Sequence, residues 1–124
     1  MAEYKLTIEG RLDGLNEYTK QNRINKYTGN ICKRKNERRI QSAMIEQLNG
    51  VKIEKPVYID FLWVEKDHRR DLDNIAFAKK FFLDAAQKEG LLIRDDFRYV
   101  KGFTDRFDFD KDNPRIEITI REID

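Results

Sequence analysis

One segment of this 124-residue sequence is apolar on both sides of an extended chain. In residues 57–64 (VYIDFLWV), every odd-numbered position is apolar, and three of the four even-numbered positions are apolar too. A strand of this kind is typical of the centre of a sheet, where both faces are covered. The segment therefore predicts a central strand, and it leads directly into a group of acidic residues.

The other segments supply the remaining elements. Residues 15–31 are polar, rich in Asn and without periodicity, so we expect a long loop there, with one helical turn as an option. The alternating or helical apolar patterns predict strands over residues 4–9, 97–104 and 116–120, and helices over residues 33–48 and from residue 72 to Gly90. This order indicates an α/β (α+β) fold: a single domain over residues 1–124, with a small mixed sheet packed against two main helices.

Two acidic pairs flank the second predicted helix. Asp71 and Asp73 lie where the central strand gives way to this helix, and Asp95 and Asp96 follow it. One explanation is structural, since Asp is favoured at helix N-termini and in turns. The other is a metal site, because three carboxylates from two segments can hold Mg²⁺, which activates water for attack on a phosphodiester. Two acidic pairs around one helix make the structural explanation less convincing, and in the metal site, with Mg²⁺ or Mn²⁺, the third ligand would be Asp95 or Asp96.

A lysine on the same helix is a further candidate. Asp73, Lys80 and Asp84 share one helical face, so Lys80 is placed to reach the acidic cluster and a phosphate. The alternative is a surface pair between Lys80 and Asp84, while Lys79 is expected at the surface.

The basic residues are concentrated in one part of the chain. From Lys20 to Arg39 there are eight Lys and Arg residues against one acidic residue, Glu37. Such a segment is the electrostatic signature of a phosphate-backbone binder, although it can also be a solvated helix face. The predicted DNA-binding residues are Lys20, Arg23, Lys26, Lys33, Arg34, Lys35, Arg38, Arg39, Arg69 and Arg70.

Several other classes of protein are excluded. The single cysteine, Cys32, cannot form an internal disulfide, and no apolar run is long enough for a signal peptide or a membrane span, so we expect a cytoplasmic protein. The sequence has no zinc spacing and no Gly-rich phosphate loop. Residues 108–119 begin like a calcium loop, but Asn113 and Thr119 replace the Gly and Glu that such a loop requires.

The acidic and basic segments together resemble a known family. Residues 70–96, RDLDNIAFAKKFFLDAAQKEGLLIRDD, are similar to the signature of the RusA family of Holliday junction resolvases, in which R-D-x-D-N precedes a helix with a lysine and an L-D-A stretch. GRLDGLNEY and NKYTG also look like the opening of that family, so the resemblance covers nearly the whole chain.

The resemblance implies an Mg²⁺-dependent crossover junction endodeoxyribonuclease that acts in DNA recombination and repair. It implies catalytic roles for Asp71, Asp73, Asp95 or Asp96, and Lys80, although counting forward from Asp73 aligns the family's lysine with Phe77. It also implies a homodimer, which suits the two-fold symmetry of a four-way junction. The alternatives are a metal-dependent nuclease for flaps or other branched DNA, and a prophage DNA-binding protein of this fold that does not cleave.

Overall fold

Four strands form one mixed sheet in the computed structural model, which describes residues 2–123. The strands are β1 (Glu3–Glu9), β2 (Val57–Glu65), β3 (Val100–Phe109) and β4 (Arg115–Glu122). In the order β1-β4-β2-β3, β2 runs parallel to β3 and antiparallel to β4, and β4 runs antiparallel to β1. The predicted central position of β2 is confirmed, because this strand has a hydrogen-bonded neighbour on each side.

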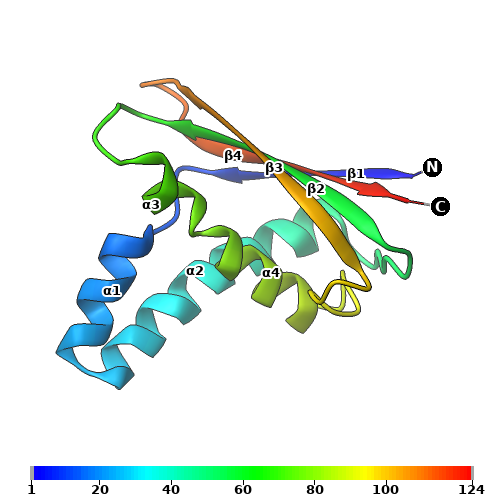
Figure 1. The fold of residues 1–124 in the computed structure, drawn as a ribbon, viewed down its shortest axis with the longest axis horizontal. Helices are drawn as coiled ribbons and strands as arrows, with labels where there is room; N and C mark the ends of the chain where they lie inside the picture. The colour runs from blue at the N-terminus through cyan, green and yellow to red at the C-terminus, as the bar shows by residue number, and fades with distance from the viewer. Residues whose placement is uncertain (1, 124) are drawn as a thin grey trace.

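The helices lie on one side of this sheet (Figure 1). They are α1 (Leu15–Ile24), α2 (Lys26–Gln47), α3 (Leu72–Ala76) and α4 (Lys79–Lys88). The core lies between them and the sheet, where Phe61 and Trp63 of β2 and Phe81 and Phe82 of α4 are each at most 2% exposed. The predicted α+β domain, with a mixed sheet packed against two main helices (α2 and α4), is therefore confirmed.

The far face of β2 departs from the prediction of coverage on both faces. Tyr58 is 43% exposed there, and Asp60 accepts hydrogen bonds from Thr104 (2.6 Å) and Arg121 (2.8 Å) on the neighbouring strands. Cross-strand polar pairs of this kind stabilise an open sheet face without a second layer. Of the four residues of β2 on this face only Val64 is buried, so the expectation of two covered faces was wrong for most of the strand.

The expectation of a long loop over residues 15–31 was also wrong. These residues form α1 and the first turns of α2, joined at Asn25, whose side chain accepts a hydrogen bond from the Thr28 amide at 2.8 Å. The two helices approach closely at Gly29, where a Cβ would lie 1.7 Å from the Asn22 side chain. None of the residues of α1 is buried, so this hairpin has no apolar stripe by which sequence periodicity could reveal it.

Two other boundaries differ from the predictions. The single helix expected before Gly90 is interrupted at Phe77 and Ala78, which divide it into α3 and α4. The strand expected over residues 97–104 begins at Val100 and continues to Phe109. Among residues 2–123, none of the helices combines the length and the hydropathy needed to cross a bilayer.

Candidate functional site

Asp71 and Asp73 extend from the loop that follows β2. Asp71 occupies the N-cap position of α3 with extended backbone angles (φ −70°, ψ 154°), but its side chain makes no capping hydrogen bond. Both residues are exposed, and within residues 2–123 neither carboxylate has a hydrogen bond or an ion pair. Capping therefore does not account for Asp71, and both carboxylates are free to accept a ligand.

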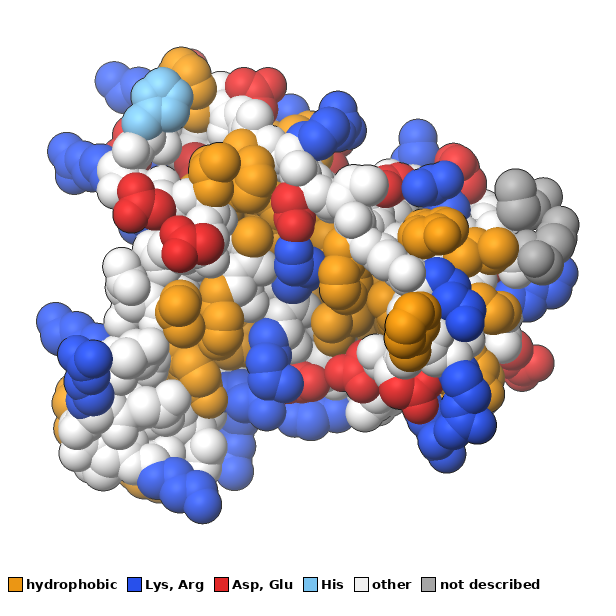
Figure 2. All heavy atoms as spheres, in the orientation of Figure 1, with side chains coloured by type: hydrophobic (Ala, Val, Ile, Leu, Met, Phe, Trp, Pro, Cys, Tyr) orange, Lys and Arg blue, Asp and Glu red, His pale blue; other side chains and the backbone are white. Residues whose placement is uncertain are grey.

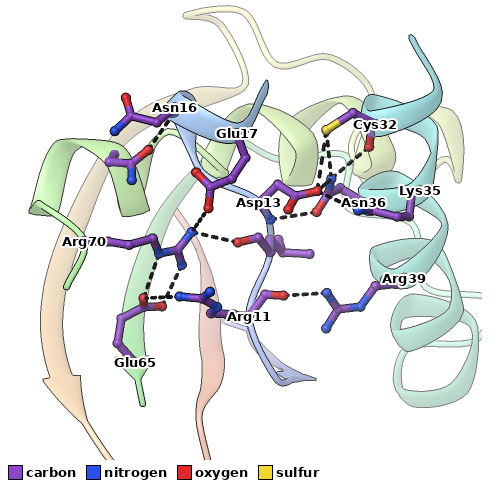
Figure 3. Close-up of polar contacts among 12 residues, drawn as sticks. Arg11, Asp13, Asn16, Glu17, Cys32, Lys35, Asn36, Arg39, Glu65 and Arg70 are labelled. Atoms are coloured by element: carbon purple, nitrogen blue, oxygen red, sulfur yellow. Dashed lines mark hydrogen bonds and ion pairs between the residues drawn. The ribbon is translucent and has the colours of Figure 1, made fainter. Parts of the chain in front are cut away.

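Arg70, immediately before this pair, is held inside the protein. Its guanidinium donates two hydrogen bonds to Glu65, at 2.9 and 2.8 Å, and others to the Leu12 carbonyl and to Glu17 (Figure 3). The side chains of Arg70 and Glu65 are only 10% and 6% exposed. Burial alone would lower the pKa of Arg70, but the hydrogen bonds and charges of Glu65 and Glu17 outweigh it and raise that pKa. Arg70 thus fixes the end of β2 to the chain before α1.

Asn74, the last residue of the R-D-x-D-N motif, joins α3 to α1. Its side-chain oxygen accepts a hydrogen bond from the Asn16 amide at 2.8 Å, in the first turn of α1. The N-cap residue of α1 is Gly14, which has no side chain for this purpose. A Cβ on Gly14 would lie 2.5 Å from the Asn74 carbonyl oxygen, so only glycine fits at this contact. Asn74 therefore serves as the cap of α1 from another element.

A pocket lined with cations opens on one side of Asp71. This basic pocket has a volume of about 390 Å³, and its walls include Arg11, Lys20, Lys66, Arg69 and Asp71. The predicted DNA-binding residues Lys20 and Arg69 thus share a pocket with a predicted catalytic carboxylate. Arg11 and Lys66 were missed in the sequence, although Lys66 directly follows the strand that leads to the motif.

The ten predicted DNA-binding residues divide into those whose side chains have no partner in the described chain and those whose side chains are paired. Within residues 2–123, no ion pair or hydrogen bond engages the side chains of Lys20, Arg23, Lys26, Arg34 and Arg38. The remaining five have acidic or carbonyl partners: Lys33 with Asp84 and Glu37, Lys35 with Asp13, Arg39 with two carbonyls, Arg69 with Asp67, and Arg70 with Glu65 and Glu17. Figure 2 shows many Lys and Arg side chains around the α1–α2 hairpin.

The second acidic pair lies elsewhere. Figure 1 places the loop with Asp95 and Asp96 at the end of α4 opposite to α3, and a helix of ten residues is about 15 Å long. Asp95 is exposed, whereas Asp96 accepts the Arg98 amide and lies 3.7 Å from Arg94. Because α4 separates the two pairs, this chain does not bring Asp95 or Asp96 to Asp71 and Asp73.

The lysines of α4 also differ from their predicted positions. Lys80 is 61% exposed and pairs with Asp84 at 3.5 Å, which is the alternative that leaves it at the surface. Lys79, expected at the surface, turns toward the sheet and contacts Asp105 and the rings of Phe61 and Phe103. The break before α4 changes the helical phase, so a face counted from Asp73 does not continue into α4.

Cys32 lies in a small polar cluster near the start of α1. Its thiol is 5% exposed and donates to Asp13 at 3.5 Å, and Asn36 donates to the same carboxylate at 2.8 Å (Figure 3). Burial and the negative charge of Asp13 raise the pKa of Cys32 to about 11. The thiol is therefore a poor nucleophile at neutral pH.

Asp71 and Asp73 suit an open magnesium site better than a metal site that protein side chains enclose. Among residues 2–123, no group of three or more His, Cys, Asp or Glu side chains is arranged to hold a metal. Mg²⁺, however, is usually bound through one or two carboxylates, with waters and substrate phosphates as its other ligands.

Comparison with known proteins adds no relative, since no family model and no curated protein matches this chain.

Proposed function

We propose that the protein is a Mg²⁺-dependent endodeoxyribonuclease that cuts four-way DNA junctions, with Asp71 and Asp73 as the metal ligands. The observation that carries this proposal is the pair of exposed carboxylates without partners, one of which, Asp71, lines a pocket rich in cations. A purely structural acid would be expected to use its carboxylate as a cap or in an ion pair, as Asp13 and Asp84 do.

Each group has a part in the proposed hydrolysis. Asp71 and Asp73 would hold Mg²⁺, which polarises a phosphoryl oxygen and lowers the pKa of bound water. Lys20, Lys66 and Arg69 would attract the DNA backbone and orient its phosphate in the basic pocket. Arg70 would position the motif through Glu65 rather than contact DNA.

The choice of a junction as substrate is supported by the resemblance of residues 70–96 to the RusA family and by the free cations of α1 and α2. A four-way junction has approximate two-fold symmetry, so a homodimer would present one site to each of two opposed strands. We also propose a cytoplasmic location, since the single cysteine is free and buried.

Cleavage of labelled DNA tests this function. Four-way junction, flap and plain duplex are incubated with the protein in Mg²⁺, Mn²⁺ or EDTA. We expect metal-dependent nicks in opposed junction strands, which Asp73→Asn abolishes and Asp112→Asn preserves. Asp112 is an exposed acid in the turn between β3 and β4, so it is the matched control for lost negative charge.

Three other outcomes would change the assignment. Junction binding without nicks in either metal would leave only a DNA-binding protein. Equal cutting of flap and junction would point to a nuclease for branched DNA in general. Cleavage that persists in Asp73→Asn would place the metal ligands elsewhere in the chain.

A further inference from the structure

A second pocket lies on the other side of Asp71 from the basic pocket. It has a volume of about 490 Å³, within the range of about 300–1,000 Å³ that holds small ligands. Its apolar wall is formed by Leu72, Ile75, Phe107 and Phe109, and His68 stands at its edge. We call it the aromatic pocket. Asp71, Asp67 and Arg70 line both pockets, so they form the wall between them.

The aromatic pocket exists because α3 is too short to cover the end of β3. Phe107 and Phe109 lie on the side of β3 that carries Asp105, which contacts Lys79 of α4, so they are on the helical side of the sheet. Although His68 contacts it, Phe109 remains 53% exposed, and Leu72 is 57% exposed. In Figure 2 the single histidine stands beside hydrophobic side chains and carboxylates in this region.

The exposed ring of Phe109 has an exposed histidine as its neighbour. His68 contacts it edge to face, with ring centroids 4.2 Å apart and planes at 70°. Phe109 stays 53% exposed despite this contact, and unstacked nucleobases bind proteins by stacking on exposed aromatic rings. Exposed apolar surface next to a candidate catalytic group is more consistent with binding than with a defect of packing.

The two pockets differ in the charge of the side chains that line them. The basic pocket suits a phosphate, because its cations (Arg11, Lys20, Lys66, Arg69 and Arg70) outnumber its carboxylates (Glu17, Asp67 and Asp71). In the aromatic pocket four carboxylates (Glu65, Asp67, Asp71 and Asp108) outnumber the one guanidinium, that of Arg70, which disfavours an anion but leaves the apolar wall open to a neutral ring. A nucleotide has these two parts, a charged phosphate and a flat neutral base, joined by one sugar.

We propose that the aromatic pocket binds one unpaired nucleobase of the DNA strand whose phosphate occupies the basic pocket. The inference rests on the proposed function and deepens it, because it names the feature of the substrate that the site selects. A base inside an intact duplex cannot enter the pocket without leaving its stack. The pocket therefore favours strands that are open at a branch point, and it places the phosphodiester of the captured nucleotide beside Asp71 and Asp73.

Binding in EDTA tests this inference without any cleavage. Fluorescence anisotropy gives the affinity for two decamers, one of thymidine and one of abasic deoxyribose with the same phosphates. We expect the thymidine decamer to bind about tenfold more tightly, since stacking on one aromatic side chain is worth about 1–3 kcal/mol per base. Phe109→Ala should remove this difference by weakening only the thymidine decamer, and Phe109→Leu should remove most of it while keeping an apolar side chain.

Phe97→Ala is the matched control, because Phe97 is also an exposed phenylalanine, at 78%, but precedes the opposite end of β3. It should leave both affinities unchanged. Equal affinity of the wild-type protein for the two decamers would overturn the inference, and so would equal weakening of both by Phe109→Ala. If Phe109→Ala changed the sedimentation of the protein and not its DNA binding, the pocket would instead be a contact between two copies. Metal-dependent nicking that is lost in Asp73→Asn would stand in each of these cases, so the two proposals fail separately.

Discussion

Arg69 and Arg70 are neighbours in the sequence but lie in opposite environments. The side chain of Arg69 is 87% exposed at the basic pocket, whereas that of Arg70 is 10% exposed and bound to Glu65. Because the two arginines are consecutive, the sequence alone does not distinguish them. The structure does: Arg69 faces DNA in our proposal, and Arg70 holds the motif in place.

Loss of Arg70 should destabilise the protein. Arg70→Ala would leave Glu65 buried with only the longer contact to Arg11 at 3.7 Å, and removal of one partner of a buried pair costs about 3–5 kcal/mol. Arg69→Ala should change the free energy of unfolding by less than about 0.5 kcal/mol. Urea denaturation of both variants measures the difference, and equal stability would contradict the structural role of Arg70.

Cys32 gives a prediction on pH. Only the thiolate reacts with iodoacetamide, and a pKa of about 11 leaves little thiolate below pH 10. The rate of alkylation of the native protein should therefore keep rising, about tenfold per pH unit, from pH 7 to pH 10. Asp13→Asn removes the adjacent negative charge, lowers the pKa of Cys32 and should speed the reaction at pH 8. A rate that levels off near pH 9 in the wild-type protein would contradict the raised pKa.

At the scale of elements, the contact of α3 with α1 can be tested by removing the cap. Asn74→Ala deletes the acceptor of the Asn16 amide and should cost about 1 kcal/mol. Gly14→Ala should cost more, because its Cβ meets the Asn74 carbonyl at 2.5 Å, and combining the two changes should not restore stability. Asn49→Ala, an exposed site after α2, is the control. Thermal unfolding compares them, and an unchanged midpoint in Gly14→Ala would contradict the close approach.

The elements that the sequence reveals are those that bury a periodic apolar face. The apolar pattern of β2 predicts its place in the sheet. Polar segments such as the α1–α2 hairpin have no such pattern and cannot be predicted in this way. The α1–α2 hairpin depends on a cap from Asn74, on the Asn25 cap and on stacking of Tyr18 against Phe77 at 5.6 Å. The contacts made by Asn74 and Phe77 join residues far apart in the sequence, so they cannot be predicted from a local pattern.

The same limit applies to the candidate site. Asp71 and Asp73 are separated by one residue and stay together in the fold, since a strand and a helix fix their positions. The grouping with Asp95 or Asp96 required the chain to fold back across α4, which it does not do. Spacing along a helix also misplaced Lys80, because the break at Phe77 and Ala78 is not visible in the apolar pattern.

At the scale of the whole molecule, the free cations make a prediction about salt. Each cation that neutralises a phosphate adds about 0.9 to the slope of log affinity against log salt concentration. Lys20→Ala and Arg23→Ala should each reduce the slope by up to about 0.9 for a labelled junction in EDTA. Lys33→Ala should leave the slope unchanged, because Lys33 pairs with Asp84 and Glu37. An unchanged slope in the first two variants would contradict the proposed DNA surface.

The position of β4 has a consequence for how the protein is made. In the described chain β4 is the last strand, yet it lies between β1 and β2 and is the only strand bonded to β1. During translation, β1 therefore has no strand to pair with until the ribosome has synthesised more than a hundred further residues. In that interval, one edge of β2 and both edges of β1 stay open, and unpaired edges are where chains associate wrongly. Once synthesised, β4 covers one edge of β1 and the open edge of β2 together, so the four-stranded sheet is complete only after β4 has been made.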